Sequence, residues 1–186
     1  MREFKKPKFR LLYLDPLYDF TGSGFYYSLM TFDETFECVD YDSLTDDAVI
    51  LIWVTNAMGT RVSVKMASLG WEEKEILTWS KYDKDYKPVF RGGHDMKHVN
   101  ERLYMFRRAI PKKPHEKWFF ECAVPNQIHT IIKGMKISQK PLQMYDFCEA
   151  MVPNGPYLEL WARVNNQREG WVSVGIESIK YLVKQN

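Results

Sequence analysis

The chain has 186 residues, of which 45% are hydrophobic and 27% are charged. This composition provides a substantial apolar core and excludes a chain that is disordered throughout, and the length matches one domain spanning residues 1–186. The formal net charge is only +2, which excludes attraction of a polyanion by the charge of the whole molecule as a basis for function.

Short apolar runs along the chain predict strands. Most of these runs are continuous rather than alternating, which is typical of strands that are buried on both faces. They cover residues 11–14, 49–54, 76–79, 103–106, 117–122, 129–132 and 157–162.

Between these runs, apolar residues recur at steps of three and four and predict helices. Residues 56–69 form the first such pattern, and Gly70 follows where a left-handed cap would end the helix. Residues 141–152 form the second, which begins with a proline, and a last helix is predicted over 178–184. Strands that alternate with helices predict an α/β fold with a mainly parallel sheet flanked by helices.

The first predicted strand is followed by Asp15, Pro16, Leu17 and Tyr18. Ligands of open α/β sheets bind at the carboxyl ends of the strands, so this tetrapeptide is a candidate catalytic segment. The exocyclic amine of a nucleobase is a poor nucleophile because its lone pair is delocalised into the ring. A carboxylate and a backbone carbonyl that accept its two N–H groups would localise that lone pair toward a methyl donor, while an aromatic ring stacks on the base. Taken alone, the tetrapeptide also fits an ordinary turn.

Further segments shift this balance toward catalysis, because they follow one another in a characteristic order. They are VILIWVTN (49–56), GW (70–71), ILTWSK (76–81), GH (93–94), HVNE (98–101), SQKP (138–141), YLELWAR (157–163), GW (170–171) and GIE (175–177). The ordered set resembles the MT-A family, named for the catalytic subunit of the messenger-RNA adenosine methyltransferase, over residues 9–178. The resemblance implies a Rossmann-like methyltransferase fold with permuted motif order, S-adenosylmethionine as cofactor, and methylation of N6 of adenine in RNA or DNA.

The resemblance also implies roles for individual residues. The catalytic motif of the family falls on Asp15, Pro16, Leu17 and Tyr18. Lys140 would meet the methionine carboxylate of the cofactor. The ribose and carboxylate of the cofactor would be surrounded by Arg163, Asn165 and Asn166. The ribose hydroxyls would be held by the element that falls on Gly175, Ile176 and Glu177.

Two positions depart from the family pattern. Leu17 replaces the second proline of the catalytic motif and leaves the carboxylate, the Pro16 carbonyl and the aromatic ring in place. Ile176 replaces the usual asparagine, and we expect the loss of its amide to weaken cofactor binding by about 1 kcal/mol or more. We therefore expect an N6-adenine methyltransferase, with DNA slightly preferred over RNA. The alternatives are a catalytically inactive relative that binds nucleic acid or a catalytic partner, and a methyltransferase acting on another amine, such as that of cytosine.

Nucleic-acid contacts are expected from the charged, irregular stretch 81–100 and from basic clusters at 5–10 and 107–117. A target base must leave the duplex to react, and exposed aromatic rings could contact it. The candidate residues are Tyr82, Tyr86, Phe90, His94, His98, Lys112, Lys113 and Lys117. His94, His98 and Glu101 also have the spacing of metal ligands on a helix, but Gly92 and Gly93 argue against a helix there, and we expect no metal.

Three tryptophans, Trp53, Trp79 and Trp161, lie inside strand-like runs and are assigned to the core. The N-terminal residues lack the apolar stretch of a signal peptide, so we expect a cytoplasmic or nuclear protein that is not secreted and does not bind a membrane. The partners that we expect are nucleic acid and a second subunit, in a homodimer or in a heterodimer with a related chain.

Overall fold

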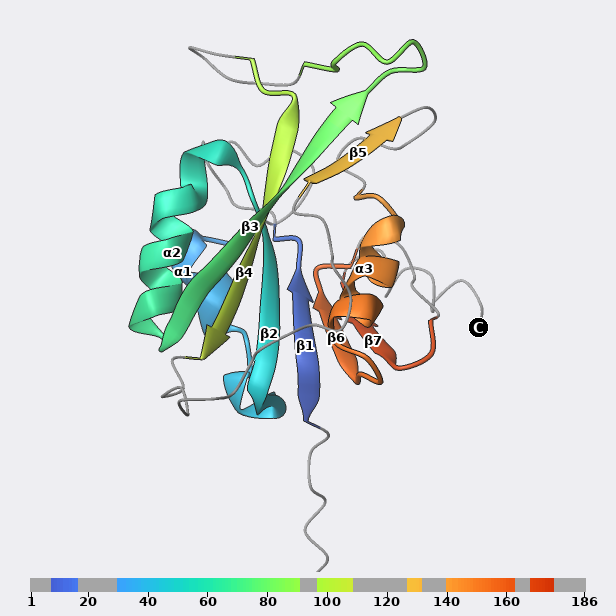
Figure 1. Ribbon diagram of the computed structural model, residues 1–186. Helices are drawn as coiled ribbons and strands as arrows, with labels where there is room; N and C mark the ends of the chain where they lie inside the picture. The colour runs from blue at the N-terminus through green and yellow to red at the C-terminus, as the bar shows by residue number, and fades with distance from the viewer. Residues whose placement is uncertain are drawn as a thin grey trace, which may run out of the picture. The chain divides into compact units, whose positions relative to one another are not determined.

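The computed structural model describes residues 8–16, 30–90, 97–108, 127–131, 140–162 and 168–175. The chain divides into two compact units. Figure 1 shows their elements, coloured by residue number from the N-terminus to the C-terminus. The first, here called the terminal unit, comprises Met1–Ala48 and Gly155–Asn186. The second, the central unit, comprises Val49–Asn154. Each unit has its own sheet pairings and its own buried residues.

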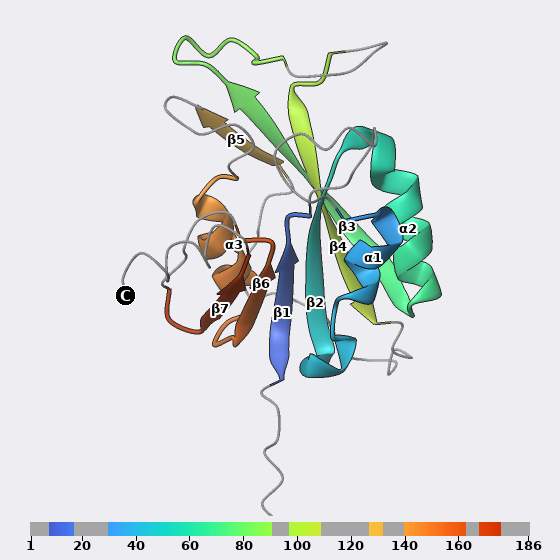
Figure 2. The ribbon, with the colours of Figure 1, turned by 180° about the vertical axis from the view of Figure 1, so that it is seen from behind.

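In the terminal unit, β1, β6 and β7 run parallel to one another. Strand β6 lies between β1 and β7 and pairs with both of them, as Figure 2 shows from behind. The bounds of the elements in this unit are β1 (Phe9–Leu14), α1 (Phe32–Glu37), η1 (Tyr41–Ser43), β6 (Tyr157–Leu160) and β7 (Trp171–Val174). Strand β2 (Leu44–Val54) begins in this unit and continues into the central one.

The short strand β7 is fixed by aromatic packing. The Trp171 ring stacks on Tyr157 of β6, with ring centroids 4.8 Å apart, and meets Tyr13 of β1 edge to face at 6.3 Å. Both arrangements are favourable for aromatic pairs and bury a large apolar area. A four-residue strand is thereby held in register with its neighbour.

The central unit has antiparallel as well as parallel pairings. Strand β4 runs antiparallel to both β2 and β3, and β3 pairs with β5 in parallel. The elements of this unit are η2 (Asn56–Met58), α2 (Gly59–Ser68), β3 (Trp71–Tyr82), β4 (Asn100–Arg108), β5 (Gln127–Ile131) and α3 (Gln143–Met151). Helix α2 lies along β3 in both views.

The predicted core of the central unit is confirmed. Residues 49–54 of β2 are all buried, as the continuous apolar run indicated. Helix α2 turns Val62 and Met66, both fully buried, toward the core, which is the stripe expected from its periodicity. Gly70 follows the helix with φ +81°, the left-handed conformation that glycine adopts without a steric penalty.

The α/β class is confirmed, and three features differ from the sequence reading in detail. Strand β4 was predicted over 103–106, but its antiparallel direction was not. The short helix α1 and the strand β7 were not predicted. Helix α1 has a capping box, in which Thr31 and Glu34 exchange side-chain and backbone hydrogen bonds. The predicted strand 117–122 and helix 178–184 lie outside the described residues. No helix in the described part of the chain is long and apolar enough to cross a membrane.

Candidate active site

Asp15 lies directly after β1, at the carboxyl end of the strand. Its side chain is buried, with 8% of the residue exposed, and Pro16 is buried beside it. The buried run Leu11–Leu14 fixes the strand in the sheet of the terminal unit, so the carboxylate is carried by a rigid element. Leu17 and Tyr18 lie outside the described residues.

A second buried carboxylate lies in the terminal unit, on β6. Glu159 is 4% exposed and accepts a hydrogen bond of 2.7 Å from the Ser173 hydroxyl of β7. The two residues are register partners across the strands, and Tyr13 of β1 faces Glu159 on the other side. The sequence reading placed Glu159 in a matching segment without giving it a role. A buried acid in an otherwise apolar strand was the available signal.

Gly175 follows β7 and lies against the chain that follows β6. A Cβ at this position would overlap the backbone of Ala162, whose N–H donates a 3.0 Å hydrogen bond to the Val174 carbonyl. The absence of a side chain therefore permits this close backbone approach. The other predicted cofactor residues of the terminal unit, Arg163, Asn165, Asn166 and Glu177, lie outside the described residues, as does Ile176.

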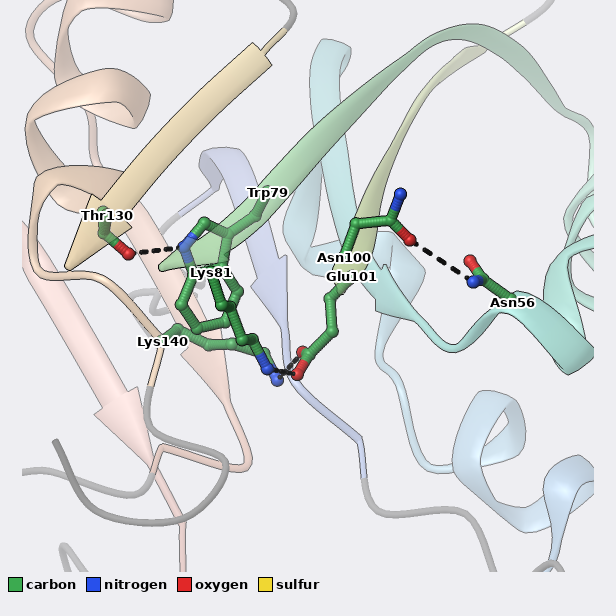
Figure 3. A network of polar contacts seen from close by, with 7 residues as sticks. All are labelled: Asn56, Trp79, Lys81, Asn100, Glu101, Thr130 and Lys140. Atoms are coloured by element: carbon green, nitrogen blue, oxygen red, sulfur yellow. Dashed lines mark hydrogen bonds and ion pairs between the residues drawn. The ribbon is translucent and has the colours of Figure 1, made fainter. Parts of the chain in front are cut away.

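In the central unit, two lysines converge on one carboxylate, as Figure 3 shows. Glu101 of β4 forms an ion pair through Oε1 with Lys81 of β3 and through Oε2 with Lys140, the latter at 2.8 Å. The side chains of Lys81, Lys140 and Glu101 are 10%, 13% and 25% exposed. We call these three residues the lysine–glutamate cluster. Burial raises the pKa of Glu101, but the two ammonium groups outweigh it and hold that pKa below its ordinary value.

The cluster rests on a pair of buried tryptophans. The Nζ of Lys81 lies 4.3 Å from the ring centroid of Trp79, and that of Lys140 lies 5.1 Å from that of Trp53. The two rings pack edge to face at 5.6 Å, and the indole N–H of Trp79 donates a 2.7 Å bond to Thr130 of β5. The assignment of Trp53 and Trp79 to the core is confirmed, with 3% and 1% exposed, while Trp161 is half-buried.

An amide group lies next to the cluster, where β2 ends. The Asn56 Nδ2 lies 2.8 Å from Nδ1 of His98 and donates to Oδ1 of Asn100 at 3.4 Å. The Oδ1 of Asn56 is buried and has no hydrogen-bond partner among the described residues. Asn56 is a polar candidate that was not singled out from the sequence, although it lies two residues after the buried strand β2.

Of the residues weighed as metal ligands, His98 and Glu101 are described and have other partners. His98 contacts Asn56, and Glu101 pairs with lysines, whereas His94 lies outside the described residues. Within the described ranges, no group of three or more His, Cys, Asp or Glu side chains is arranged to hold a metal ion.

The aromatic candidates for nucleic-acid binding lie on and beyond the end of β3. Asp83 shapes a tight turn, since its carboxylate accepts from the backbone N–H groups of Asp85 and Lys87. Tyr82 bridges to Pro88 in the antiparallel sense, and its ring packs near His129. The segment 82–90 is therefore an ordered hairpin. It presents Tyr86, 75% exposed, and Phe90, 59% exposed.

The basic clusters are described only at their ends. Arg10 pairs with Asp47 at 3.5 Å, and the Arg108 guanidinium lies over the Trp71 ring at 4.8 Å. These contacts give both arginines a packing role within their own units. Lys112, Lys113 and Lys117 lie outside the described residues.

Glu101 gives the protein a specific dependence on pH. Its pKa is lowered in the folded state, so its contribution to the free energy of unfolding is complete above its ordinary pKa of 4.5 and is lost as the pH falls through the lower, folded-state value. We expect the stability of Glu101→Gln to fall less than that of the parent between about pH 5 and pH 3. Urea unfolding at several pH values measures this difference. An equal loss of stability with falling pH in the parent and in Glu101→Gln would contradict the assignment. Glu72→Gln, which changes an exposed carboxylate near the start of β3, serves as the control.

Comparisons with known proteins identify the family of the chain. The model of the MT-A70 family matches residues 9–177. Among curated proteins, an N(6)-adenosine-methyltransferase MT-A70-like protein of Arabidopsis thaliana is 26% identical over 77% of this chain and 20% of its own length. An MT-A70-like protein of Drosophila melanogaster is 24% identical over 90% of this chain and 26% of its own length. The N(6)-adenosine-methyltransferase catalytic subunit METTL3 of Homo sapiens is 23% identical over 90% and 28%.

The chain thus spans between a fifth and about a quarter of the length of these relatives. The family model covers the chain from the first residue of β1 to beyond β7, so it includes Asp15, the lysine–glutamate cluster and Gly175. The resemblance stated from the sequence is confirmed, and the mixed α/β architecture is consistent with its Rossmann-like fold. This chain is a member of the MT-A70 family.

Proposed function

We propose that the chain is a single S-adenosylmethionine-dependent methyltransferase domain that methylates N6 of adenine in nucleic acid. The observation that carries this proposal is the buried Asp15, followed by buried Pro16, at the carboxyl end of β1. Family membership and the names of the relatives, which are N(6)-adenosine-methyltransferases, support it.

The chemistry follows from the acceptors that this segment supplies. The Asp15 carboxylate and the Pro16 carbonyl would each accept one N–H of the adenine amine, which localises the nitrogen lone pair. When bound, S-adenosylmethionine supplies an electrophilic methyl group. That methyl would pass from sulfur to the adenine amine, which would leave the cofactor as a neutral thioether, and the proton lost by the amine would pass to solvent. Tyr18 would stack on the base.

The described residues fit a cofactor of this kind. Lys140 offers an ammonium group on a side chain that is 13% exposed, and its contacts with Glu101 and Trp53 hold it in place. A fixed ammonium is suited to the carboxylate of the methionine moiety. Gly175 would allow close approach to the ribose, and Arg163, Asn165, Asn166 and Glu177 remain assigned to the same cofactor by the family pattern.

The names of the relatives bear on the choice of nucleic acid. Adenosine is the ribonucleoside, and the curated relatives are named for it. We therefore propose RNA as the first substrate to test. The preference for DNA expected from the sequence finds no support in the comparisons, and it remains the second arm of the test.

The test begins with isothermal titration of S-adenosylmethionine into the parent protein and Lys140→Ala. We expect the parent to bind and Lys140→Ala to bind more weakly, because the variant lacks the ammonium group. The parent is then incubated with unmethylated RNA and DNA, and their nucleosides are analysed by mass spectrometry. N6-methyladenosine or its deoxy counterpart is the expected product. A parent that does not bind the cofactor, or that forms only methylcytosine, would reject the proposal.

A catalytically inactive relative is the second candidate, favoured by Leu17 and Ile176. One curated relative is named a catalytic subunit, which supports assembly with a further chain. We propose that an inactive protein would act through such a partner or through bound nucleic acid. Analytical ultracentrifugation of the purified chain distinguishes a monomer from a homodimer.

The hairpin 82–90 is proposed as a contact for single-stranded nucleic acid, because two exposed rings stand beside exposed lysines in an ordered turn. Replacing Tyr86 and Phe90 with alanine should weaken binding by about 1–3 kcal/mol for each ring that stacks on a base. Fluorescence anisotropy with a labelled adenine-containing oligonucleotide measures the change. Val64→Ala removes an equally exposed apolar side chain from α2 and serves as control. Unchanged affinity in both aromatic variants would remove the hairpin from the binding surface.

A further inference from the structure

The lysine–glutamate cluster joins three separate segments of the central unit through one carboxylate. Glu101 and Trp79 are register partners on β4 and β3, and Lys81 follows two residues later on the same strand. Lys140 precedes α3 and comes from a distant part of the sequence. Each oxygen of Glu101 pairs with one ammonium group, so a single carboxylate binds both lysines.

This arrangement limits where the Lys140 ammonium can lie. A lysine side chain has a flexible four-carbon stem and loses considerable rotamer entropy when it is fixed. Here the Nζ is held by Oε2 of Glu101 at 2.8 Å, and the face of Trp53 lies 5.1 Å away. Lys81 holds the other oxygen of the same carboxylate and itself lies over Trp79. Glu101 is therefore itself held through its second oxygen.

We propose that Glu101 is a positioning residue, which fixes the ammonium group of Lys140 for the carboxylate of the cofactor, and that Lys81 anchors Glu101 in that role. The inference rests on the proposed function, because it assumes that Lys140 meets the cofactor. An ammonium group has three N–H donors, so a lysine that bonds to one carboxylate can also donate to a second. A pre-positioned donor binds more tightly because less freedom is lost on binding.

A positioning role and simple electrostatics predict opposite changes in cofactor affinity for Glu101→Gln. Glu101→Gln removes a negative charge near Lys140, and by Coulomb attraction alone this would strengthen the binding of an anion. If Glu101 positions Lys140, the same substitution weakens binding, because a neutral amide holds an ammonium group less firmly than a carboxylate does. The direction of the change therefore decides between the two.

The experiment is isothermal titration of S-adenosylhomocysteine, which carries the same carboxylate and is chemically stable. We expect Glu101→Gln to bind about tenfold or more weakly than the parent, and Lys81→Met to bind more weakly as well. In a Lys140→Ala background, Glu101→Gln should change affinity less than about twofold, whereas a general structural defect would weaken both backgrounds equally. Glu72→Gln makes the same charge change on a carboxylate that pairs with Lys74 at the surface, and it should leave affinity unchanged. Equal or tighter binding by Glu101→Gln would overturn the proposal.

A second measurement does not depend on the cofactor. An amine must lose its proton to react with acetic anhydride, and Glu101 stabilises the protonated, buried form of Lys140. Quantified by peptide mass spectrometry, acetylation of Lys140 should be several-fold faster in Glu101→Gln than in the parent, with the exposed Lys84 unchanged. If Lys140 is acetylated faster in Glu101→Gln but the parent does not bind the cofactor, the proposed function is rejected. The conclusion that Glu101 fixes Lys140 would then still hold. Unchanged acetylation would reject the positioning role, whatever the cofactor result.

Discussion

Replacing Asp15 with alanine is expected to lower the rate of methyl transfer by about a hundredfold or more while cofactor binding persists. The carboxylate would accept an N–H of the amine as positive charge develops on nitrogen, and this contribution to the transition state is worth about 3 kcal/mol or more. Its buried position at the end of β1 makes the acceptor preorganised. Single-turnover methylation with labelled S-adenosylmethionine measures the loss.

Two further variants complete this test. Asp15→Asn keeps the shape and an acceptor oxygen but removes the charge, so we expect activity between the parent and Asp15→Ala. Leu17→Pro restores the family pattern without touching the carboxylate. If the parent is silent and Leu17→Pro transfers methyl groups, the chain is an inactive relative. If parent and Asp15→Ala are equally active, Asp15 has no part in the chemistry.

Trp79→Ala is expected to lower the free energy of unfolding by about 3–5 kcal/mol, the range for deletion of a large buried aromatic side chain. The ring is 1% exposed, packs against Trp53, and lies beneath the ammonium group of Lys81. Its removal would leave a cavity and would also loosen the lysine–glutamate cluster. Urea unfolding followed by circular dichroism measures the loss.

Trp79→Phe separates packing from hydrogen bonding at this position. Phenylalanine retains an aromatic ring but cannot donate to Thr130, so we expect a smaller loss, of about 1–2 kcal/mol. A loss below about 1 kcal/mol in Trp79→Ala would show that the ring is not part of the cooperative core.

The sequence predicted best those elements whose signal is local. The continuous run of β2 and the periodicity of α2, with Gly70 after it, depend on near neighbours in the chain, and the structure confirms them. Helix α1 was missed because it is short and polar, and its strongest signal is the capping box of Thr31 and Glu34. The strand β7 has only four residues and depends on aromatic packing from elsewhere.

The residues of the candidate site also divide into those that the local sequence predicts and those that it does not. Asp15 was placed correctly at the end of a strand, because an acid after an apolar run is visible in the sequence. The partners of Glu101 could not be predicted, since Lys81 is 20 and Lys140 is 39 positions away along the chain. Only the antiparallel pairing of β3 with β4 and the course of the chain before α3 bring them together. Charge pairs of this kind are properties of topology rather than of local pattern.

The close approach of Gly175 to the Ala162 backbone affects how active and inactive members of the family can be told apart. Any side chain at this position would collide with the main-chain atoms of Ala162. Glycine therefore lets the chain after β7 lie against the chain after β6. A homologue that has lost catalysis but must still fold would keep this glycine. Retention of Gly175 is therefore evidence that a homologue can fold and says nothing about turnover.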